Sequence, residues 1–431
     1  MKPNEMIAYA GIAAGLIIAA TMAVAFLTKP AQAADDPPLV LARDGFFYVN
    51  AKTTTADGKD YVSHQMYVEV RIPAKQTHPY PIVMVHGGTM SGTNYTGTPD
   101  GREGWAQYFV RQGFAVYVVD QPGRARSGYL AAAYGPMHNV ERGNALSRFV
   151  AQEKFKLWPQ AALHTQWPGS GEPDDPATVQ LAASQMPAIA DFASQQFLNR
   201  DALLALLDKI GPAILLTHSQ AGAFGWPVAD ARPDLVKAIL AIEPNGPPFY
   251  QVEFKGAPDW FKQGTLALPY GITAVPLTYA PPIKDASELK MVQQDKADSP
   301  DLVRCYAQAE PARQLPNLQK MPILVLTAEA SYHAPYDHCT VNYLRQAGVK
   351  PTYIRLADIG IKGNSHVMML EKNNKEIAAV IASGWTKRCR TNSPSLRVRL
   401  APPFSPRAGR GDFISDSSGN KTSSGHSARC A

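Results

Sequence analysis

Charged residues and cysteines are both scarce in this 431-residue sequence. Asp, Glu, Lys and Arg make up only 18% of it, whereas 45% is hydrophobic, which excludes a fully disordered chain. The four cysteines show no C-x-x-C spacing of the kind that binds zinc, and we expect no metal site. An internal repeat and a collagen-like glycine period are also absent. The chain has enough apolar residues for a large core.

The net charge of +6 is concentrated at the C-terminal end. Residues 391–431 hold six Lys or Arg and two Asp, so they carry most of the positive charge. The body of the chain, residues 34–390, is close to neutral and has no basic stripe with interleaved aromatic residues. Nucleic-acid binding is therefore not expected.

The two ends of the chain differ in composition from the body. Residues 6–27 are almost wholly apolar or small, Lys2 precedes them, and Ala31-Gln32-Ala33 follows. This order predicts a secretory signal over residues 1–33, and a periplasmic or secreted body with no membrane span after cleavage. An uncleaved membrane anchor is the alternative, because 22 apolar residues can cross a bilayer. Residues 391–431 are rich in Ser, Arg, Gly and Pro, which predicts a disordered tail.

The four cysteines can form disulfides if the body folds in an oxidising compartment. Four cysteines allow three pairings, and spacing alone does not choose between them. We favour Cys305–Cys339, because Cys389 and Cys430 lie at or within the tail.

Short apolar runs alternate with segments of helical spacing through the body of the chain. The alternation predicts an α/β fold with a mostly parallel sheet and helices on both faces, over a single domain of residues 34–390. Residues 129–197 and 246–320 interrupt it and are predicted to be cap insertions over the carboxyl edge of the sheet. The predicted strands cover residues 67–72, 82–85, 114–119, 213–216, 236–242, 323–326 and 352–356, and the clearest helices cover 102–112, 336–347 and 372–385.

The strongest chemical signal is Thr217-His218-Ser219-Gln220-Ala221-Gly222, between a buried strand and a helix. A nucleophile elbow needs such a sharp turn, with small residues two before and two after the nucleophile. Here Thr217 stands where a glycine is usual, and Ala221 follows Ser219 at the second position. Ser219 is the predicted nucleophile. The alternative is an ordinary strand-to-helix turn that Ser219 caps.

An oxyanion hole requires two backbone N–H groups aimed at the developing negative charge. The first is expected from Gln220, at the start of the helix, and the second from the turn that contains Gly88 and Thr89 after an early strand. A glycine-rich turn without a catalytic role is the alternative.

A serine nucleophile needs a general base, and the order in this type of fold is serine, acid, histidine. His366 is the candidate, because it alone lies on a loop between the last strand and the last helix. His333 and His338 follow the preceding strand and are weaker candidates.

The acid has more than one candidate. The usual position, after the strand at residues 323–326, offers Glu329 and then Asp337. One strand earlier, Glu243 follows directly on an apolar run and precedes a proline. A carboxylate at such a position is costly to bury without a partner, which favours Glu243, with Glu329 next.

Several motifs together resemble the bacterial esterase 713-like branch of the α/β-hydrolases. They are Val85-His86-Gly87-Gly88, Thr98-Pro99-Asp100-Gly101-Arg102, Asp120-Gln121-Pro122-Gly123-Arg124, Ile242-Glu243-Pro244-Asn245-Gly246 and Gly363-Asn364-Ser365-His366. The resemblance covers about residues 42–386. It implies a Ser219, Glu243 and His366 triad with oxyanion N–H groups from Gln220 and the Gly88–Thr89 turn. A member of that branch can carry adjacent cysteines where Gly88 and Thr89 stand here, so properties that depend on such a pair do not transfer.

These observations predict a serine hydrolase that cleaves small-molecule carboxylic esters through an acyl-enzyme and needs no cofactor. Trp226, Phe249 and Tyr250 follow the catalytic motifs and are candidates for an apolar substrate pocket, with a place in the core as the alternative. The same triad could act on lactones, amides or peptides, since the insertions decide the substrate. A non-catalytic binding protein on a hydrolase fold is a third hypothesis, and a homodimer is compatible with the sequence.

Overall fold

The computed structural model describes residues 36–389, with side chains described up to residue 383. The predicted signal (1–33) and the predicted disordered tail (391–431) lie outside this range. Within the described part of the chain, no helix is both long enough and apolar enough to cross a membrane.

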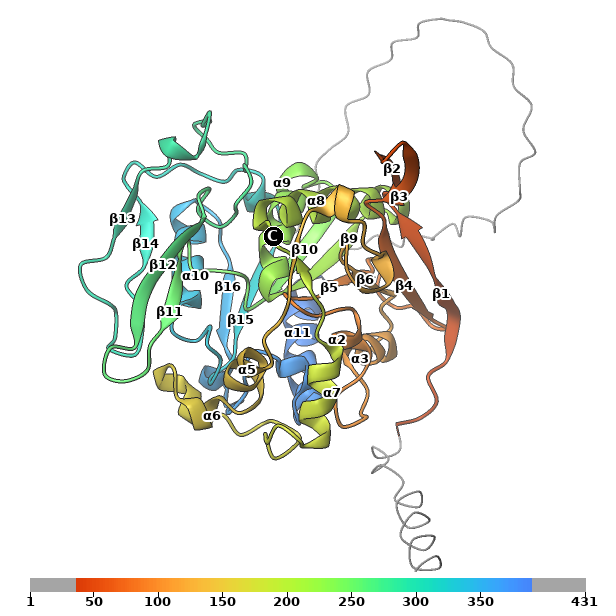
Figure 1. Cartoon of the computed structure of the whole chain (residues 1–431), viewed down its shortest axis with the longest axis horizontal. Helices are drawn as coiled ribbons and strands as arrows, with labels where there is room; N and C mark the ends of the chain where they lie inside the picture. The colour runs from red at the N-terminus through yellow and green to blue at the C-terminus, as the bar shows by residue number, and fades with distance from the viewer. Residues whose placement is uncertain (1–35, 390–431) are drawn as a thin grey trace, which may run out of the picture.

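An eight-stranded sheet forms the centre of the molecule, in the order β1-β4-β6-β5-β9-β10-β15-β16 (Figure 1). The six strands from β6 to β16 are parallel, and β4 and β1 add an antiparallel edge. The predicted mostly parallel sheet is therefore confirmed. The strands are β1 (Leu41–Val49), β4 (Met66–Pro73), β5 (Ile82–Val85), β6 (Val116–Asp120), β9 (Ala213–His218), β10 (Val236–Ile242), β15 (Ile323–Thr327) and β16 (Thr352–Arg355).

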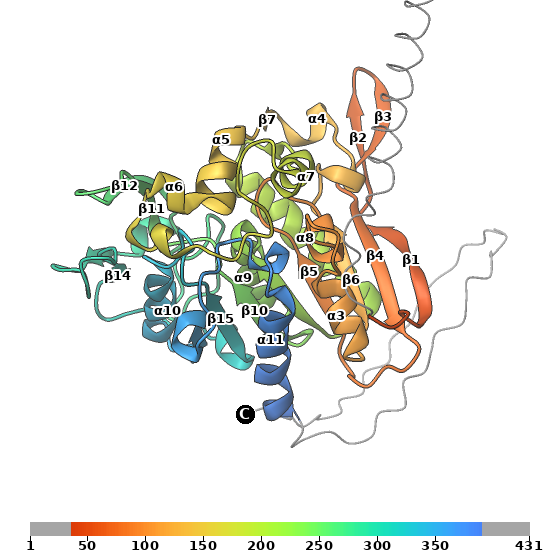
Figure 2. The same ribbon diagram turned by 90° about the horizontal axis from the view of Figure 1, so that it is seen from below.

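Helices cover both faces of the sheet, which is why its central strands are apolar on both sides. Alternate residues of β9 point to opposite faces: Leu215 packs in the core cluster with α8, α9 and α10, and Leu216 in the cluster with α3 and α11. Figure 2 shows α3 and α11 on the same side of the sheet. These helices are α3 (Trp105–Arg111), α8 (Phe192–Ile210), α9 (Gly222–Ala231), α10 (Asp337–Gln346) and α11 (Asn374–Cys389).

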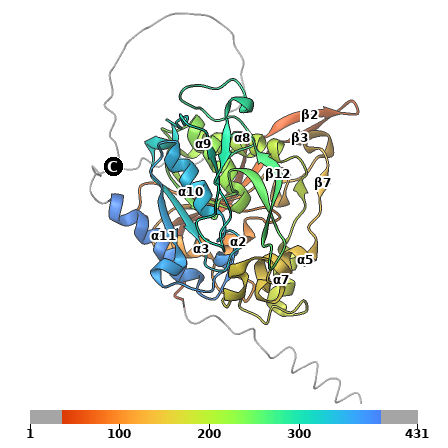
Figure 3. The same cartoon turned by 90° about the vertical axis from the view of Figure 1, so that its left-hand side faces the viewer.

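The two predicted insertions contain short elements. In residues 129–197 these are α4 (Ala131–Tyr134), β7 (Met137–His138), α5 (Arg142–Ala145), the π-helix η2 (Leu146–Val150), α6 (Gln152–Phe155), η3 (Pro159–Leu163), α7 (Pro176–Ser184) and β8 (Ala188–Ile189). In residues 246–320 two strand pairs form, β11 (Phe249–Phe254) with β12 (Phe261–Leu268) and β13 (Met291–Gln293) with β14 (Tyr306–Gln308). In Figure 3, α5 and α7 lie together at one side of the molecule.

The first insertion contacts the loop that follows β15. The Gln152 amide and the Trp158 indole N–H both donate to the Ala330 carbonyl oxygen, at 2.9 and 3.0 Å. The insertion is thus tied to the carboxyl end of a central strand. The predicted boundary at residue 197 falls inside α8, which already begins at Phe192.

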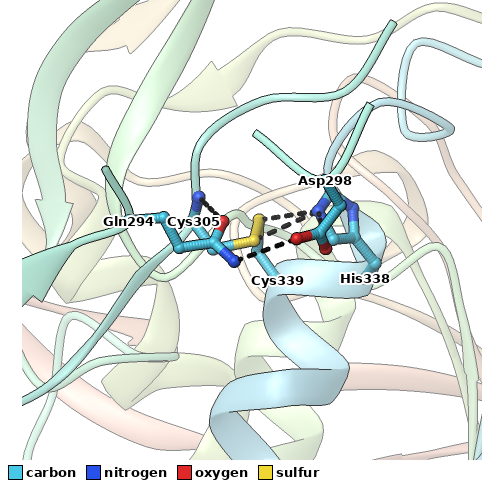
Figure 4. Close-up of a disulfide and its surroundings, with 5 residues drawn as sticks. All are labelled: Gln294, Asp298, Cys305, His338 and Cys339. Atoms are coloured by element: carbon cyan, nitrogen blue, oxygen red, sulfur yellow. Dashed lines mark hydrogen bonds and ion pairs between the residues drawn. A yellow bond between two sulfur atoms is a disulfide. The ribbon is translucent and has the colours of Figure 1, made fainter. Parts of the chain in front are cut away.

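A disulfide joins Cys305 to Cys339, the predicted pairing, and connects the second insertion to the first turn of α10 (Figure 4). Both sulfurs are buried. Gln294 accepts a hydrogen bond from the Cys305 backbone N–H at 2.8 Å, and the His338 ring lies 3.2 Å from the Cys305 sulfur. The disulfide therefore holds the β13–β14 pair against α10.

Candidate active site

Ser219 lies at the tip of the turn between β9 and α9, with a φ of 56°. This left-handed conformation is uncommon for a residue with a Cβ and occurs at nucleophile elbows. The turn is held from two sides: the Asn245 N–H donates to the Ser219 carbonyl oxygen at 2.8 Å, and a Cβ on Gly222 would lie only 2.5 Å from that of Pro244. Ser219 is partly exposed, so its hydroxyl can meet a substrate.

The unusual Thr217 is accommodated by a glycine one turn into α9. A Cβ on Gly225 would lie 3.0 Å from the Thr217 methyl carbon, which is closer than ordinary contact. Because Gly225 has no side chain, the Thr217 side chain fits at a position where a glycine is usual. The departure from the elbow pattern is compensated locally.

His366 and Glu243 form a short polar contact at this edge of the sheet. The His366 Nδ1 atom is 2.5 Å from a Glu243 carboxylate oxygen, and both side chains are almost completely buried. Glu243 also accepts hydrogen bonds from the Ala328 N–H at 2.7 Å and from the Ser331 hydroxyl at 2.6 Å. These contacts give the buried carboxylate the partners that its position requires.

Burial moves the pKa values of this pair in opposite directions. It raises the pKa of the Glu243 carboxyl, a rise that the hydrogen bonds from Ser331 and Ala328 oppose, and it lowers the pKa of His366 well below its usual range. The nearby Arg148 guanidinium further lowers the His366 pKa. His366 is therefore a neutral imidazole at neutral pH, which is the form that can accept a proton.

The other two acids on the β15 side have different partners. Glu329 accepts a hydrogen bond from the Gly363 backbone N–H at 2.8 Å. Asp337 accepts from His333 at 2.8 Å and from the Thr327 hydroxyl at 2.6 Å. Of the three candidate acids in the described residues, only Glu243 has a hydrogen bond to His366.

Tyr332 connects the predicted base and nucleophile. Its hydroxyl is 3.1 Å from His366 Nε2, and the Ser219 side chain is near enough to lower the Tyr332 pKa. Burial raises the pKa of Tyr332, so the hydroxyl remains neutral. The sequence analysis did not identify Tyr332. Its position in the loop that follows β15, at the carboxyl edge of the sheet, is the signal that could have identified it.

Two further histidines surround the His366 ring. His218 lies one residue before Ser219, and its Nε2 is 2.9 Å from the His366 carbonyl oxygen. The His333 ring stacks on His366, with centroids 4.5 Å apart and planes 14° from parallel. Burial lowers the pKa of both, to about 3 for His218 and about 4 for His333. The His333 ring therefore packs against the His366 ring and supports its position. The remaining candidate, His338, lies beside the disulfide.

The predicted oxyanion turn packs directly against Ser219 and Gln220. A Cβ on Gly87 would lie 2.9 Å from that of Ser219, and one on Gly88 would lie 3.6 Å from the Gln220 amide carbon. Thr89 has a φ of 62°, which turns the chain sharply at this point. The structure therefore brings Gly88, Thr89 and Gln220 together beside the predicted nucleophile.

Hydrogen bonds from three side chains hold this turn. The Gln121 amide donates to the His86 carbonyl oxygen at 2.7 Å, and the buried Arg124 donates to that of Gly87 at 3.1 Å. From the first insertion, Gln185 accepts from the Thr89 hydroxyl at 2.6 Å. The Asp120–Arg124 motif thus fixes the carbonyl groups of the turn.

A buried ion pair supports the loop that carries His366. His164, from the first insertion, lies between Glu371 at 2.8 Å and Glu153 at 3.0 Å. Glu371 in turn accepts hydrogen bonds from the Ser365 backbone N–H at 3.0 Å and the Asn364 amide at 2.7 Å. Burial alone would lower the pKa of His164, but hydrogen bonds to the two carboxylates raise it to about 9.

We expect His164→Gln to lower the free energy of unfolding by about 2–4 kcal/mol at pH 6, because the buried Glu371 carboxylate loses its cationic partner. Since the folded pKa lies above the usual 6.5, this stabilisation is complete below pH 6.5 and is lost as the pH rises through about 9. Urea unfolding at pH 6 and at about pH 10 measures the difference between wild type and variant. His138→Gln, at an exposed position on β7, is the control. If the free energy of unfolding differed between wild type and His164→Gln by the same amount at both pH values, the ion-pair assignment would be contradicted.

The three predicted pocket aromatics separate into two groups. Trp226 and Phe249 are fully buried in the core cluster on the α8–α9 side of the sheet, which is the alternative that the sequence left open. Tyr250 lines a cavity of about 220 Å³ between the two strand pairs of the second insertion. Proximity to Ser219 or Glu243 along the chain therefore did not place these side chains at the site.

Within the described part of the chain, two groups of side chains have donor atoms close enough together to hold a metal ion. They are Glu243, His333 and His366, and Cys305, His338 and Cys339, each with atoms within 4.8 Å of one another. In the first group, Glu243 and His366 are paired and His333 is bonded to Asp337. In the second, the two sulfurs form the disulfide. The hydrogen-bond network accounts for the first arrangement and the disulfide for the second.

Comparisons with known proteins identify the family and the enzyme class. Residues 82–380 match the model of the alpha/beta hydrolase family. The chain is 43% identical over 345 residues to the probable secreted lipase phiG of Fungal sp. (strain ATCC 74256), over 80% of this chain and 89% of the relative. Among solved structures, a novel bacterial esterase aligns with a TM-score of 0.52 and 23% identity, over 82% of this chain and 98% of that one. The predicted fold and the predicted enzyme class are confirmed.

Proposed function

The chain belongs to the alpha/beta hydrolase family, and we propose that it is a secreted carboxylic ester hydrolase that acts through a covalent intermediate on Ser219. The observation that carries this proposal is the convergence of three groups. Ser219 has the φ of an elbow, His366 has its Nδ1 atom 2.5 Å from Glu243, and the Tyr332 hydroxyl lies 3.1 Å from His366 Nε2.

In the first half of the reaction, His366 Nε2 accepts the Ser219 proton while the hydroxyl oxygen attacks the ester carbonyl carbon. Glu243 accepts the Nδ1–H hydrogen bond, which fixes the tautomer and stabilises the imidazolium that forms. The negative charge develops on the carbonyl oxygen beside the Gly88–Thr89 turn and the Gln220 N–H. His366 then protonates the leaving alkoxide, and the acyl group stays on Ser219.

In the second half, water attacks the acyl-enzyme and His366 again accepts the proton. Collapse of the second tetrahedral intermediate returns the proton to Ser219 and releases the acid. Burial lowers the pKa of His366, so the imidazole is unprotonated and ready for both steps at neutral pH.

The name of the curated relative supports secretion, and the Cys305–Cys339 disulfide is consistent with an oxidising compartment. We propose that the N-terminal segment acts as a secretory signal. Its sequence, positive at the start, apolar in the middle and small at residues 31 and 33, is the basis for this assignment.

A substrate panel tests the reaction class. We expect the purified body of the protein to hydrolyse short-chain p-nitrophenyl esters, and to cleave matched p-nitroanilides much more slowly, because an amine is a poorer leaving group than a phenol. Release of the nitrophenol or nitroaniline is followed by absorbance. Faster cleavage of the anilides, or no cleavage of any ester, would contradict an esterase assignment.

A further inference from the structure

Arg148 is a cation that lies close to the proposed catalytic groups and has no polar partner among the described residues. It lies on the π-helix η2 of the first insertion and is half-buried. Its guanidinium carbon is 5.3 Å from the centroid of the Tyr332 ring and 5.9 Å from that of Phe254. Among the side chains that the structure describes, none forms an ion pair or a hydrogen bond with it.

The π-helix places this segment directly over the loop of His366. The neighbouring Phe149 ring stacks on His366 with centroids 5.6 Å apart, and its carbonyl oxygen accepts a hydrogen bond from the Ser365 hydroxyl at 3.0 Å. Single π-turns of this kind are rare and occur frequently at functional sites. Arg148 therefore stands on an element that is fixed to the catalytic loop, next to the Tyr332 ring whose hydroxyl contacts His366.

The positive charge of Arg148, which no described side chain neutralises, disfavours the hydrolysis of a neutral ester. After burial and the two neighbouring histidines, the Arg148 charge is a further cause that lowers the pKa of His366, and so it disfavours the imidazolium that hydrolysis requires. A substrate anion bound to Arg148 would neutralise its charge and so remove this effect on the His366 pKa.

We propose that Arg148 binds a free carboxylate of the substrate, so that the preferred substrates are esters that carry a second, unesterified carboxyl group. A guanidinium presents two parallel N–H groups to a carboxylate, and the flanking Tyr332 and Phe254 rings restrict water around the pair. The carboxylate can belong to the acid part or to the alcohol part of the ester. This inference rests on the proposed ester hydrolysis at Ser219.

Matched pairs of esters test the inference. Monoethyl adipate is compared with ethyl hexanoate for a carboxylate on the acid part, and 4-acetoxybutanoate with butyl acetate for one on the alcohol part, with titration of the released acid as the readout. We expect wild type to favour the anionic member of at least one pair. Arg148→Met should lower kcat/KM for that ester by about 10- to 100-fold, with no loss on its neutral match.

Two control variants separate recognition from structure. Arg148→Lys keeps the charge without the planar fork and should fall between wild type and Arg148→Met on the anionic ester. Arg142→Met removes a cation from α5, at an exposed position of the same insertion, and should leave both esters unchanged. If Arg148→Met lost kcat/KM equally on the anionic and neutral esters, or lost none on either, the assignment of Arg148 would be overturned.

Adipate binding, measured by calorimetry, does not depend on turnover. We expect wild type to bind adipate and Arg148→Met to bind it at least about tenfold more weakly. Equal binding by the two proteins overturns the carboxylate site even if esters are cleaved. Binding that depends on Arg148 in a protein that cleaves no ester would instead sustain the carboxylate site and defeat the proposed function.

Discussion

Ser219→Ala is expected to lower kcat for short esters by about 10⁵- to 10⁶-fold, because the atom that forms the covalent intermediate is removed. Alanine adds no strain, since both residues carry a Cβ at the same φ of 56°. Stopped-flow and long-time absorbance assays with p-nitrophenyl butyrate cover this range, and circular dichroism checks the fold. Ser184→Ala, on α7 in the first insertion, is the control and should keep wild-type turnover. Turnover by Ser219→Ala close to that of wild type would exclude Ser219 as the nucleophile.

Glu243→Gln is expected to lower kcat by about 10⁴-fold. The glutamine oxygen can still accept from the Ala328 N–H, but its NH₂ group then faces His366 Nδ1 and the Ser331 hydroxyl. A donor at Nδ1 forces the tautomer with the proton on Nε2, and this form cannot accept the Ser219 proton. The variant should therefore lose kcat with little change in KM.

Glu329→Gln is the matched control for the acid. Its glutamine oxygen can still accept the hydrogen bond from the Gly363 N–H, so kcat should remain within about tenfold of wild type. Steady-state kinetics of both variants on one ester, with protein stability measured alongside, separates the two carboxylates. A large loss in Glu329→Gln together with near-normal turnover in Glu243→Gln would show that the acid follows β15.

The strands of the parallel sheet could be predicted because they are buried on both faces and read as short apolar runs. The edge strand β1 could not, since most of its residues are at least partly exposed and its sequence includes a charged Arg43-Asp44 pair. The start of α8 was missed for a different reason. Gln195, Gln196 and Asn199 are buried there and find hydrogen-bond partners, so polar residues occupy positions where a helical pattern predicts apolar ones.

At the candidate site, the sequence indicated the groups whose position follows from strand ends. Ser219, Glu243 and the Gly88–Thr89 turn each follow a strand, and parallel strands end at the same edge of the sheet. The contacts of Tyr332 and Arg148 with each other depend on how the first insertion packs over the β15 loop, which no local pattern encodes. The same limit applies to Trp226, which is close to Ser219 in sequence but points into the core.

Covalent labelling tests the central claim most directly, because it reports which atom is the activated nucleophile. The protein is treated with a fluorophosphonate, and the modified peptide is identified by mass spectrometry while residual esterase activity is followed. We predict one adduct per chain, on Ser219, formed in step with the loss of activity and absent in Ser219→Ala and strongly slowed in Glu243→Gln. Complete inactivation with the adduct on another residue, or full activity in a chain that is labelled at Ser219, would contradict the account.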